Sequence, residues 1–311
     1  MSRTLHLLTG CTAVGKTELA LRWAEVNNAE IVSCDSLLFY RGADIGTAKP
    51  SQTELARVPH HLINVCDVKE QMDVTYYVTK ARAAIDDIMG RKRQVLVTGG
   101  SGFYLRAFLG PVADAVEVAE ELRTELRGQL EKEGLTALVK ELQGLNPAGL
   151  GALDIQNPRR VLRALERCRA AGRTLAELLK DFAAQPAPFA DYAVKLSELV
   201  REPAELDQRI ELRVAAMLRD GLVEEVRGLL AKGLKQNPSA ARAIGYRETI
   251  DFIEGRRPAL NQSNGPESEL GAAIAKNTRA LVKKQRTWFK AQLPPHRQPD
   301  ASTIEVRELF V

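Results

Sequence analysis

Gly10-Cys-Thr-Ala-Val-Gly-Lys-Thr17 lies between a hydrophobic run at residues 5–9 and a helical pattern at residues 18–24. This order of strand, glycine loop and helix is that of a phosphate-binding loop. The glycines let the backbone curl so that successive N–H groups point inward, and the new helix adds the positive end of its dipole. Lys16 supplies a mobile positive charge, and the Thr17 hydroxyl is suited to binding Mg²⁺. We therefore predict a di- or triphosphate site formed by Gly10, Cys11, Thr12, Ala13, Val14, Gly15, Lys16 and Thr17.

The composition is that of a soluble globular protein with a sizeable core: 311 residues, 45% hydrophobic and 27% charged, with a net charge of +4. The four cysteines are widely spaced and form no Cys-x-x-Cys pair, so we expect neither a zinc module nor a disulfide framework. The N-terminus runs into the first strand without a signal-peptide pattern, and no apolar run reaches membrane-spanning length. We expect a cytoplasmic protein with no membrane association.

Alternating strands and helices predict an α/β fold with a parallel sheet in the first third of the chain. The predicted strands are 4–9, 30–35, 59–66 and 94–100. A helix runs to about residue 28, another covers 74–89, and residues 36–50 form a long surface connection. We therefore expect a parallel-sheet core built on the phosphate-binding loop, with helices on both faces.

The character of the chain changes near residue 110, because residues 118–182 have helical periodicity throughout. We predict an all-helical insertion domain at 112–186, placed between core segments 1–111 and 187–311. A strand at 192–200 returns the chain to the sheet. Helices at 203–219, 222–232, 239–255 and 269–292, a flexible loop at 257–268 and a final strand at 303–309 follow.

The residues alone leave the chemistry open. Asp35 ends a buried strand, and in open α/β sheets ligands bind at that edge. Phosphoryl transfer usually needs a second acid at a strand end to hold Mg²⁺, but the strand at 94–100 ends in glycines. Asp35 could take that metal role, or it could be a turn residue. A kinase, an ATPase and another diphosphate enzyme all remain possible.

Segments along nearly the whole chain closely resemble the tRNA dimethylallyltransferase family, also called tRNA isopentenyltransferases. They are GCTAVGKT (10–17), EIVSCDSLLFYRGADIGTAKP (30–50), GGSGFYL (99–105), NPRRVLRALE (157–166), QRIELRVAAMLRDGLVEEV (208–226), RAIGYRE (242–248) and NTRALVKKQRTWF (277–289). Paired Cys and His residues are absent after Cys168. The chain therefore resembles the bacterial members rather than the eukaryotic ones, which carry a C-terminal zinc finger.

The resemblance implies a prenyltransferase. It would transfer a dimethylallyl group from dimethylallyl diphosphate to the exocyclic amine of the tRNA adenine immediately 3′ of the anticodon, with Mg²⁺ as cofactor. Asp35 matches the family's general base, and Arg213 matches the arginine that contacts the diphosphate opposite the loop. The chemistry is consistent, because Lys16, Thr17 and loop N–H groups would stabilise a departing diphosphate, and a carboxylate would take the amine proton. Arg209, one helical turn before Arg213, could support it.

The resemblance also implies contacts with tRNA, whose target base must be flipped out of the anticodon loop. The implied contacts are Asp35, Ser36, Leu37, Leu38, Ser101, Arg123, Arg159, Arg160, Val161, Leu162, Arg163, Arg242, Ala243, Ile244, Gly245, Tyr246 and Arg247. We expect the insertion and the core to hold the anticodon stem-loop between them, with arginines on its phosphates. The same arginines could instead form ion pairs with acids such as Glu166. The protein is expected to act as a monomer.

The chain departs from the family pattern in details. Cys11 stands where proline is usual, Ser101 replaces threonine, Lys284 replaces arginine and Asn146 stands where aspartate is common. These differences affect predicted RNA contacts rather than Asp35, Lys16, Thr17 or Arg213. The competing hypotheses are a small-molecule kinase, which would turn over ATP, and a non-catalytic RNA-binding protein with a phosphate-binding loop.

Overall fold

The computed structural model describes residues 3–256 and 265–311, and only the backbone of residues 265–268. The chain forms two compact units. One, here called the core, contains Met1–Leu109 and Pro188–Val311; the other, the insertion, contains Gly110–Ala187. Within the described part of the chain, no helix has both the length and the apolar character needed to cross a membrane.

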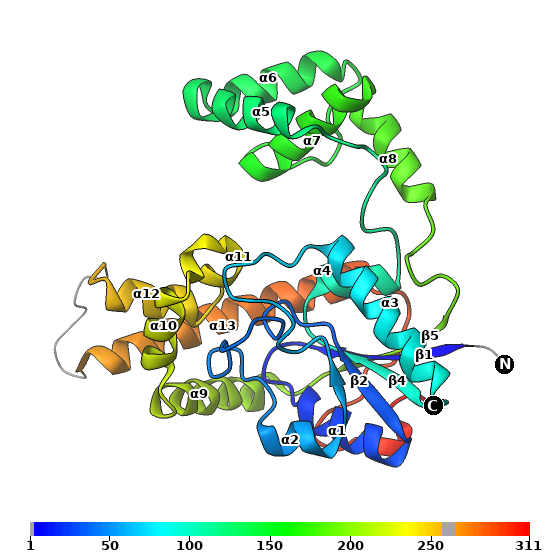
Figure 1. Ribbon diagram of the computed structural model, residues 1–311, viewed down its shortest axis with the longest axis vertical. Coiled ribbons are helices and arrows are strands. Elements are labelled where there is room, and N and C mark those ends of the chain that lie inside the picture. Colours follow the sequence, from blue (N-terminus) through cyan, green and yellow to red (C-terminus); the bar gives the residue numbers. More distant parts are fainter. Residues whose placement is uncertain (1–2, 257–264) are drawn as a thin grey trace. The chain divides into compact units, whose positions relative to one another are not determined.

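The core contains a five-stranded parallel sheet with the order β3-β2-β4-β1-β5. Its strands are β1 (Thr4–Gly10), β2 (Ala29–Ser33), β3 (His60–His61), β4 (Gln94–Thr98) and β5 (Ala193–Leu199). The chain moves outward from β1 to β2 and then back to β4. Helical connections between parallel strands are right-handed. The reversal of direction therefore places α1 (Lys16–Val26) and α3 (Val74–Gly90) on opposite sides of the sheet (Figure 1). The predicted α/β class is confirmed.

The remaining core helices flank the insertion in the sequence. Before the insertion these are α2 (Gln52–Arg57), α4 (Gly102–Leu105) and the 3₁₀ helix η1 (Arg106–Phe108). After β5 they are α9 (Pro203–Arg219), α10 (Leu222–Ala231), η2 (Leu234–Gln236), α11 (Pro238–Ala241), α12 (Tyr246–Ile253), α13 (Gly265–Gln292) and η3 (Val306–Glu308). Among them, α2 and η3 pack against α1, and α9, α10, α12 and α13 form a group beside the sheet (Figure 1). The long pair α9 and α13 pack against each other.

The insertion consists of α5 (Glu120–Glu133), α6 (Leu135–Leu145), α7 (Pro158–Ala171) and α8 (Leu175–Ala184), which confirms the helical prediction. Its own core is built from residues such as Leu126, Leu138 and Leu165, all fully buried. In the core unit, the rings of Phe108 and Phe189 stack with centroids 4.4 Å apart. The chain segments that lead into and out of the insertion therefore lie side by side where they leave the core.

Two predicted elements are wrong in detail because of backbone geometry. The strand predicted at 59–66 shrinks to β3, since Leu62 and Asn64 have φ angles of 61° and 57°, which a strand cannot include. The helix predicted at 239–255 splits into α11 and α12 at Gly245, whose φ is 92°. The connection at 36–50 is also not simply a surface loop, because Phe39 and Tyr40 are buried.

The strand predicted at 303–309 is a turn followed by η3. Its buried residues Val306 and Leu309 are three apart, a spacing that favours a 3₁₀ turn over an alternating strand. The pairing is made earlier, by single bridges from Arg297 to Ser197 of β5 and from Asp300 to Val200, just after β5. Of the loop predicted at 257–268, residues 257–264 lie outside the described residues, and α13 already starts at Gly265.

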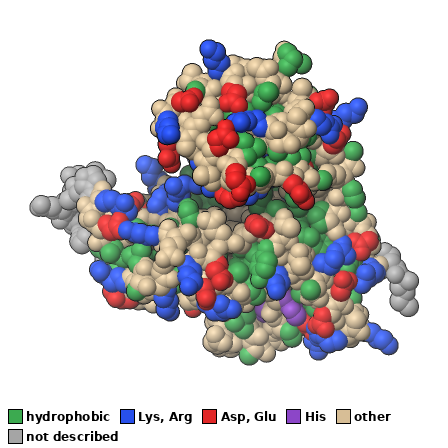
Figure 2. Space-filling model, turned by 45° about the horizontal axis from the view of Figure 1, so that its top comes forward, with side chains coloured by type: hydrophobic (Ala, Val, Ile, Leu, Met, Phe, Trp, Pro, Cys, Tyr) green, Lys and Arg blue, Asp and Glu red, His purple; other side chains and the backbone are tan. Residues whose placement is uncertain are grey.

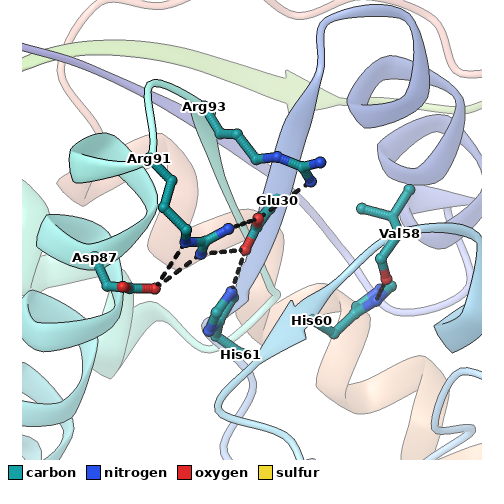
Figure 3. Close-up of polar contacts among 7 residues, drawn as sticks. All are labelled: Glu30, Val58, His60, His61, Asp87, Arg91 and Arg93. Carbon is teal, nitrogen blue, oxygen red and sulfur yellow. Dashed lines mark hydrogen bonds and ion pairs between the residues drawn. The ribbon is translucent and has the colours of Figure 1, made fainter.

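A buried acid joins neighbouring strands near one edge of the sheet. Glu30 on β2 is 1% exposed, and Figure 3 shows Arg91, Arg93 and His61 converging on its carboxylate. His61 Nε2 lies 2.7 Å from Glu30 Oε2, and Arg91 donates to both oxygens. Hydrogen bonds from Arg91 and then His61 lower the pKa of Glu30 to about 2. This network ties β2 to β3 and to the turn before β4.

The network predicts an acid-sensitive contribution to stability. A carboxylate whose folded pKa is lowered stabilises the fold above its unfolded pKa of 4.5, and the effect is lost as the pH falls toward 2. Glu30→Gln should therefore cost about 2 kcal/mol of unfolding free energy at pH 7 and much less at pH 3. Urea unfolding at both pH values measures this, with Asp67→Asn as a control, because Asp67 is exposed and pairs with Arg41 outside this network. An equal loss at both pH values would assign the effect to packing.

Candidate active site

The phosphate-binding loop lies between β1 and α1 and is shaped by unusual backbone angles. Gly10 and Gly15 have φ angles of 146° and 109°, and Ala13 has 67°. A Cβ on Gly10 would lie 2.7 Å from the carbonyl oxygen of Leu199, so β5 leaves room only for glycine. The geometry is that of a backbone curl whose N–H groups can face an anion.

Lys16 is folded over this loop. Its Nζ donates hydrogen bonds to the carbonyl oxygens of Gly10, at 2.7 Å, and Cys11, at 2.9 Å. Burial lowers the pKa of Lys16 to about 8, and the nearby positive charge of Arg213 acts in the same direction, while Asp35 opposes it. The ammonium group therefore stays mostly protonated near neutral pH but is close to its titration point.

Arginines from α9 contact the same loop. Arg209 Nε donates to the carbonyl oxygen of Ala13 at 2.8 Å, and Arg201, just before the helix, donates to that of Val14 at 3.0 Å. One turn after Arg209, the Arg213 NH2 group donates to the carbonyl oxygen of Thr47 at 3.1 Å. Burial lowers the pKa of Arg213, and the Asp35 carboxylate opposes this shift. The predicted neighbours of the loop are thus brought together.

A cavity of about 530 Å³ opens in front of the loop. Its lining includes Lys16, Thr17, Asp35, Arg209 and Arg213. Its mixed walls and its position at the carboxyl ends of β1, β2 and β4 fit a ligand with an anionic head. Asp35 follows β2, and its Oδ1 accepts a hydrogen bond from the Leu37 N–H at 3.0 Å.

A second cavity of about 510 Å³ lies against the first, and Asp35 and Arg213 line both. Its walls are mostly apolar and come from α9, α13 and the start of α4; they include Val214, Met217, Ile244, Ile274, Trp288 and Phe289, with Ser101 as a hydroxyl. A Cβ on Gly102 would lie 2.5 Å from the Trp288 indole, so only glycine allows this close packing. Such walls suit a flat heterocycle.

The IPP transferase family model matches residues 38–292. The chain belongs to the IPP transferase family. It is 63% identical over 300 residues to the tRNA dimethylallyltransferase of Opitutus terrae, covering 96% of this chain and 94% of that protein. It is also 40% identical over 307 residues to the tRNA dimethylallyltransferase of Deinococcus radiodurans, covering 97% and 95%.

Solved structures support the same relationship. The full-length tRNA isopentenylpyrophosphate transferase from Bacillus halodurans superposes with a TM-score of 0.68 at 29% identity, covering 99% of this chain and 93% of that chain. A eukaryotic dimethylallyltransferase acting on tRNA superposes with a TM-score of 0.77, covering 93% of this chain and 70% of the other. At 22% identity, this second likeness concerns the fold alone.

Gln285 is a site residue that the sequence reading missed. Its Oε1 accepts from the Thr12 N–H at 2.9 Å, and its Nε2 donates to the Gly100 carbonyl oxygen at 3.0 Å. It thereby links the phosphate-binding loop to the end of β4 and lines both cavities. A signal was present in the sequence. Gln285 is a polar residue four positions after Leu281 and four before Phe289, so helical spacing places it on the same inward face of α13 as these two apolar residues.

Several predicted RNA-contacting residues lie around the second cavity, but two of the assigned side chains are buried. Leu37, Ser101 and Ile244 line the cavity, Leu38 lines the first one, Ser36 is half-buried, and Arg242 and Arg247 are exposed. Tyr246 is 1% exposed, with its hydroxyl donating to Glu225 at 2.9 Å. Val161 is fully buried in the insertion core. Both side chains pack inside the protein and line neither cavity, so RNA contact at these two positions stays a prediction.

The arginines predicted to meet RNA in the insertion lie on its surface. Arg123, Arg160 and Arg163 are within 3.3–3.7 Å of Glu120, Asp154 and Glu166, respectively, and Arg159 is exposed. Exposed pairs such as that of Arg160 with Asp154 are weak and leave the arginine available to a stronger anion, whereas Glu166, the partner of Arg163, is itself buried. Arg159, Arg160 and Arg163 line a cavity of about 660 Å³ within the insertion. Elsewhere, charges of both signs are interspersed over the visible face (Figure 2).

The donor set fits a magnesium ion held jointly with a phosphate ligand. Within residues 3–256 and 265–311, no group of three or more His, Cys, Asp or Glu side chains is placed to hold a metal alone. Thr17 and Asp35 offer oxygen atoms at the first cavity. Mg²⁺ commonly binds through one or two protein oxygens together with substrate phosphates and water. These residues are therefore compatible with the predicted cofactor.

Proposed function

We propose that this protein transfers a dimethylallyl group from dimethylallyl diphosphate to the exocyclic amine of the tRNA adenine immediately 3′ of the anticodon. The observation that carries the proposal is that Asp35 and Arg213 line both adjoining cavities. The cationic cavity at the loop suits the diphosphate, and the apolar one suits a flipped adenine. Membership of the IPP transferase family and relatives named tRNA dimethylallyltransferase support the same reaction.

The diphosphate side supplies stabilisation of the leaving group. The allylic C–O bond breaks, and its electron pair leaves with the diphosphate. Loop N–H groups, Lys16 and Arg213 surround the cavity where this negative charge would develop. Mg²⁺ bound with Thr17 would add positive charge to the diphosphate oxygens.

The adenine side supplies the nucleophile and loses a proton. A bond forms between the adenine nitrogen and the prenyl carbon, and Asp35 takes the proton released by the amine. The Asp35 carboxylate is held in place by the hydrogen bond from Leu37 N–H. Because the walls of the second cavity are mostly apolar, they would exclude water that could otherwise capture the prenyl group.

The proposal is tested by incubating the protein with dimethylallyl diphosphate and unmodified tRNA, followed by mass spectrometry of the nucleosides. We expect prenylated adenosine to appear and ATP to be left intact. Turnover of ATP with a small acceptor, without prenylated adenosine, would instead indicate the kinase. Binding of tRNA without either product would indicate a non-catalytic RNA-binding protein.

We further propose that the anticodon stem-loop contacts the insertion through Arg123, Arg159, Arg160 and Arg163, and that the enzyme acts in the cytoplasm as a monomer. A flipped base gives the core little area to hold, so stem phosphates would supply much of the affinity. The exposure of Arg159, Arg160 and Arg163 supports this, and Arg123 is half-buried.

Arg159→Gln combined with Arg163→Gln should flatten the salt dependence of tRNA binding. The affinity falls as salt rises, and each lost phosphate contact reduces the steepness of log affinity against log salt by about 0.7–0.9. Titration with an anticodon stem-loop at several salt concentrations measures the slope, with Arg127→Gln plus Arg173→Gln as a control in the same unit. If these arginines only brace the insertion, the slope stays the same and the melting temperature falls.

The lowered pKa of Lys16 predicts that kcat/KM for the prenyl donor falls at high pH. The protonated form of Lys16 attracts the diphosphate, and its pKa of about 8 means that this form is lost as the pH rises above 8. kcat/KM for the donor should then fall about tenfold per pH unit. In Lys16→Arg the guanidinium stays charged, so its profile should remain flat. A wild-type profile that is flat to pH 9.5 would contradict this role.

A further inference from the structure

A short turn in the core lies beside Arg213, and the family resemblance gave it no separate role. Residues 43–49 fold back on themselves: the Ala48 N–H donates to the Ile45 carbonyl oxygen at 3.0 Å and the Lys49 N–H to that of Asp44 at 2.9 Å. The Thr47 hydroxyl donates to the Ala43 carbonyl oxygen at 2.8 Å. The backbone carbonyl of Thr47 is turned toward Arg213, from which it accepts a hydrogen bond. The turn thus presents one acceptor to the arginine.

Glu225, on α10, holds this turn by its backbone. Its Oε2 accepts from the N–H groups of Asp44 at 2.8 Å and Ile45 at 2.6 Å, and its Oε1 accepts from that of Gly46 at 3.0 Å. Successive N–H groups that converge on one point form an anion-binding concavity. Here a carboxylate from another helix fills it. A charged acceptor makes such hydrogen bonds roughly twice as strong as neutral ones.

Tyr246 fixes the carboxylate from the other side. Its hydroxyl donates to Glu225 Oε1 at 2.9 Å, and its ring lies under Gly46, where a Cβ would approach within 2.7 Å of ring carbon. Lys49 anchors the far end of the turn, because its buried Nζ donates to the Tyr40 carbonyl oxygen at 2.7 Å and to Asn64 Oδ1 at 2.6 Å. The turn is therefore held at both ends by polar contacts.

We propose that Glu225 is a positioning residue for the prenyl-transfer reaction. It holds the turn so that the Thr47 carbonyl fixes the orientation of the Arg213 guanidinium against the departing diphosphate. Arg213 has a planar fork of donors, so fixing one NH2 group sets the direction of the others. Glu225 acts through Thr47 and Arg213, and it lines neither of the two cavities described above. This inference rests on the proposed function.

The expected effect follows from this geometry. Glu225→Ala leaves three N–H groups without their acceptor and releases the turn. A displacement of about 1 Å at a binding group can cost about 10²-fold in rate, so we expect kcat/KM for the donor to fall about 10- to 100-fold. Glu225→Gln keeps one oxygen acceptor and should lose less. Affinity for tRNA should stay within about twofold, because Glu225 acts on the diphosphate side.

A structural role alone would give a different pattern, and a double-variant cycle separates the two. If Glu225 acts through Arg213, then Glu225→Ala should add little to the loss already caused by Arg213→Ala, because residues that act as a unit are non-additive. If Glu225 only stabilises the fold, its effect should be similar in both backgrounds. Glu224→Ala is the matched control, since Glu224 is the neighbouring acid on α10 with a side chain 79% exposed.

The experiment measures donor kcat/KM, tRNA affinity and melting temperature for wild type, Glu225→Ala, Glu225→Gln, Arg213→Ala, Glu225→Ala/Arg213→Ala and Glu224→Ala. Tyr246→Phe removes only the hydroxyl contact and serves if Glu225→Ala fails to fold. A donor-specific loss that disappears in the Arg213→Ala background supports the inference. An additive loss, or activity like that of Glu224→Ala, overturns it. Wild-type protein without prenyl transfer would instead overturn the proposed function.

Discussion

Asp35→Asn is expected to lower turnover by about 10²–10⁴, the usual scale for loss of a general base. The carboxamide cannot accept the amine proton at neutral pH. Its oxygen can still accept the hydrogen bond from Leu37 N–H, so the end of β2 should keep its shape. The variant should therefore fold and bind tRNA while losing chemistry.

Single-turnover assays with saturating donor and tRNA measure this loss directly. Asp67→Asn is a matched control, because Asp67 follows the bridge residue Cys66 but is 55% exposed and paired with Arg41. We expect normal turnover for the control and unchanged melting temperatures for both variants. Near-normal turnover of Asp35→Asn would mean that another group takes the proton.

Lys16→Ala and Arg213→Ala are each expected to lower kcat/KM for dimethylallyl diphosphate by about 10²–10³, the scale for removing one stabiliser of developing charge. Both side chains line the first cavity, from the loop and from α9. Neither variant should change tRNA affinity much, since RNA phosphates are proposed to contact other arginines. The loss should appear with any tRNA substrate.

Donor kinetics and stem-loop binding should be measured on the same preparations. Lys80→Ala, which removes an exposed lysine of α3, controls for a general change in charge. Intact donor kinetics together with lost tRNA binding would show that Lys16 or Arg213 had been assigned to the wrong substrate.

The sequence predicted the parts of this site that depend on local structure. The loop at 10–17 is a continuous segment whose glycines, lysine and flanking elements specify its shape together. Asp35 was found because the carboxyl ends of parallel strands share one edge of the sheet. Arg213 needed the family resemblance, since an arginine on an amphipathic helix gives no sign of which partner it meets.

The missed parts depend on contacts between distant segments. The hydrogen bond from Thr12 to Gln285 joins residues 273 positions apart, and those from the 44–46 turn to Glu225 span about 180 positions. No local pattern specifies such pairs. The resemblance also identified segments rather than side-chain directions, so buried Val161 and Tyr246 were grouped with the exposed arginines beside them.

The stacked pair of Phe108 and Phe189 has a consequence for how the chain folds while the ribosome synthesises it. β5 pairs with β1 along its whole length, yet the ribosome makes β5 only after the insertion. Until then β1 is an open edge strand, the kind that invites wrong pairing. The insertion has a hydrophobic core of its own, so it can fold as a unit while β5 is still being translated. Phe108 and Phe189 lie side by side where the insertion leaves and rejoins the core, so only a short gap has to close once the insertion has folded. The late strand β5 can then pair with β1 at a low cost in chain entropy.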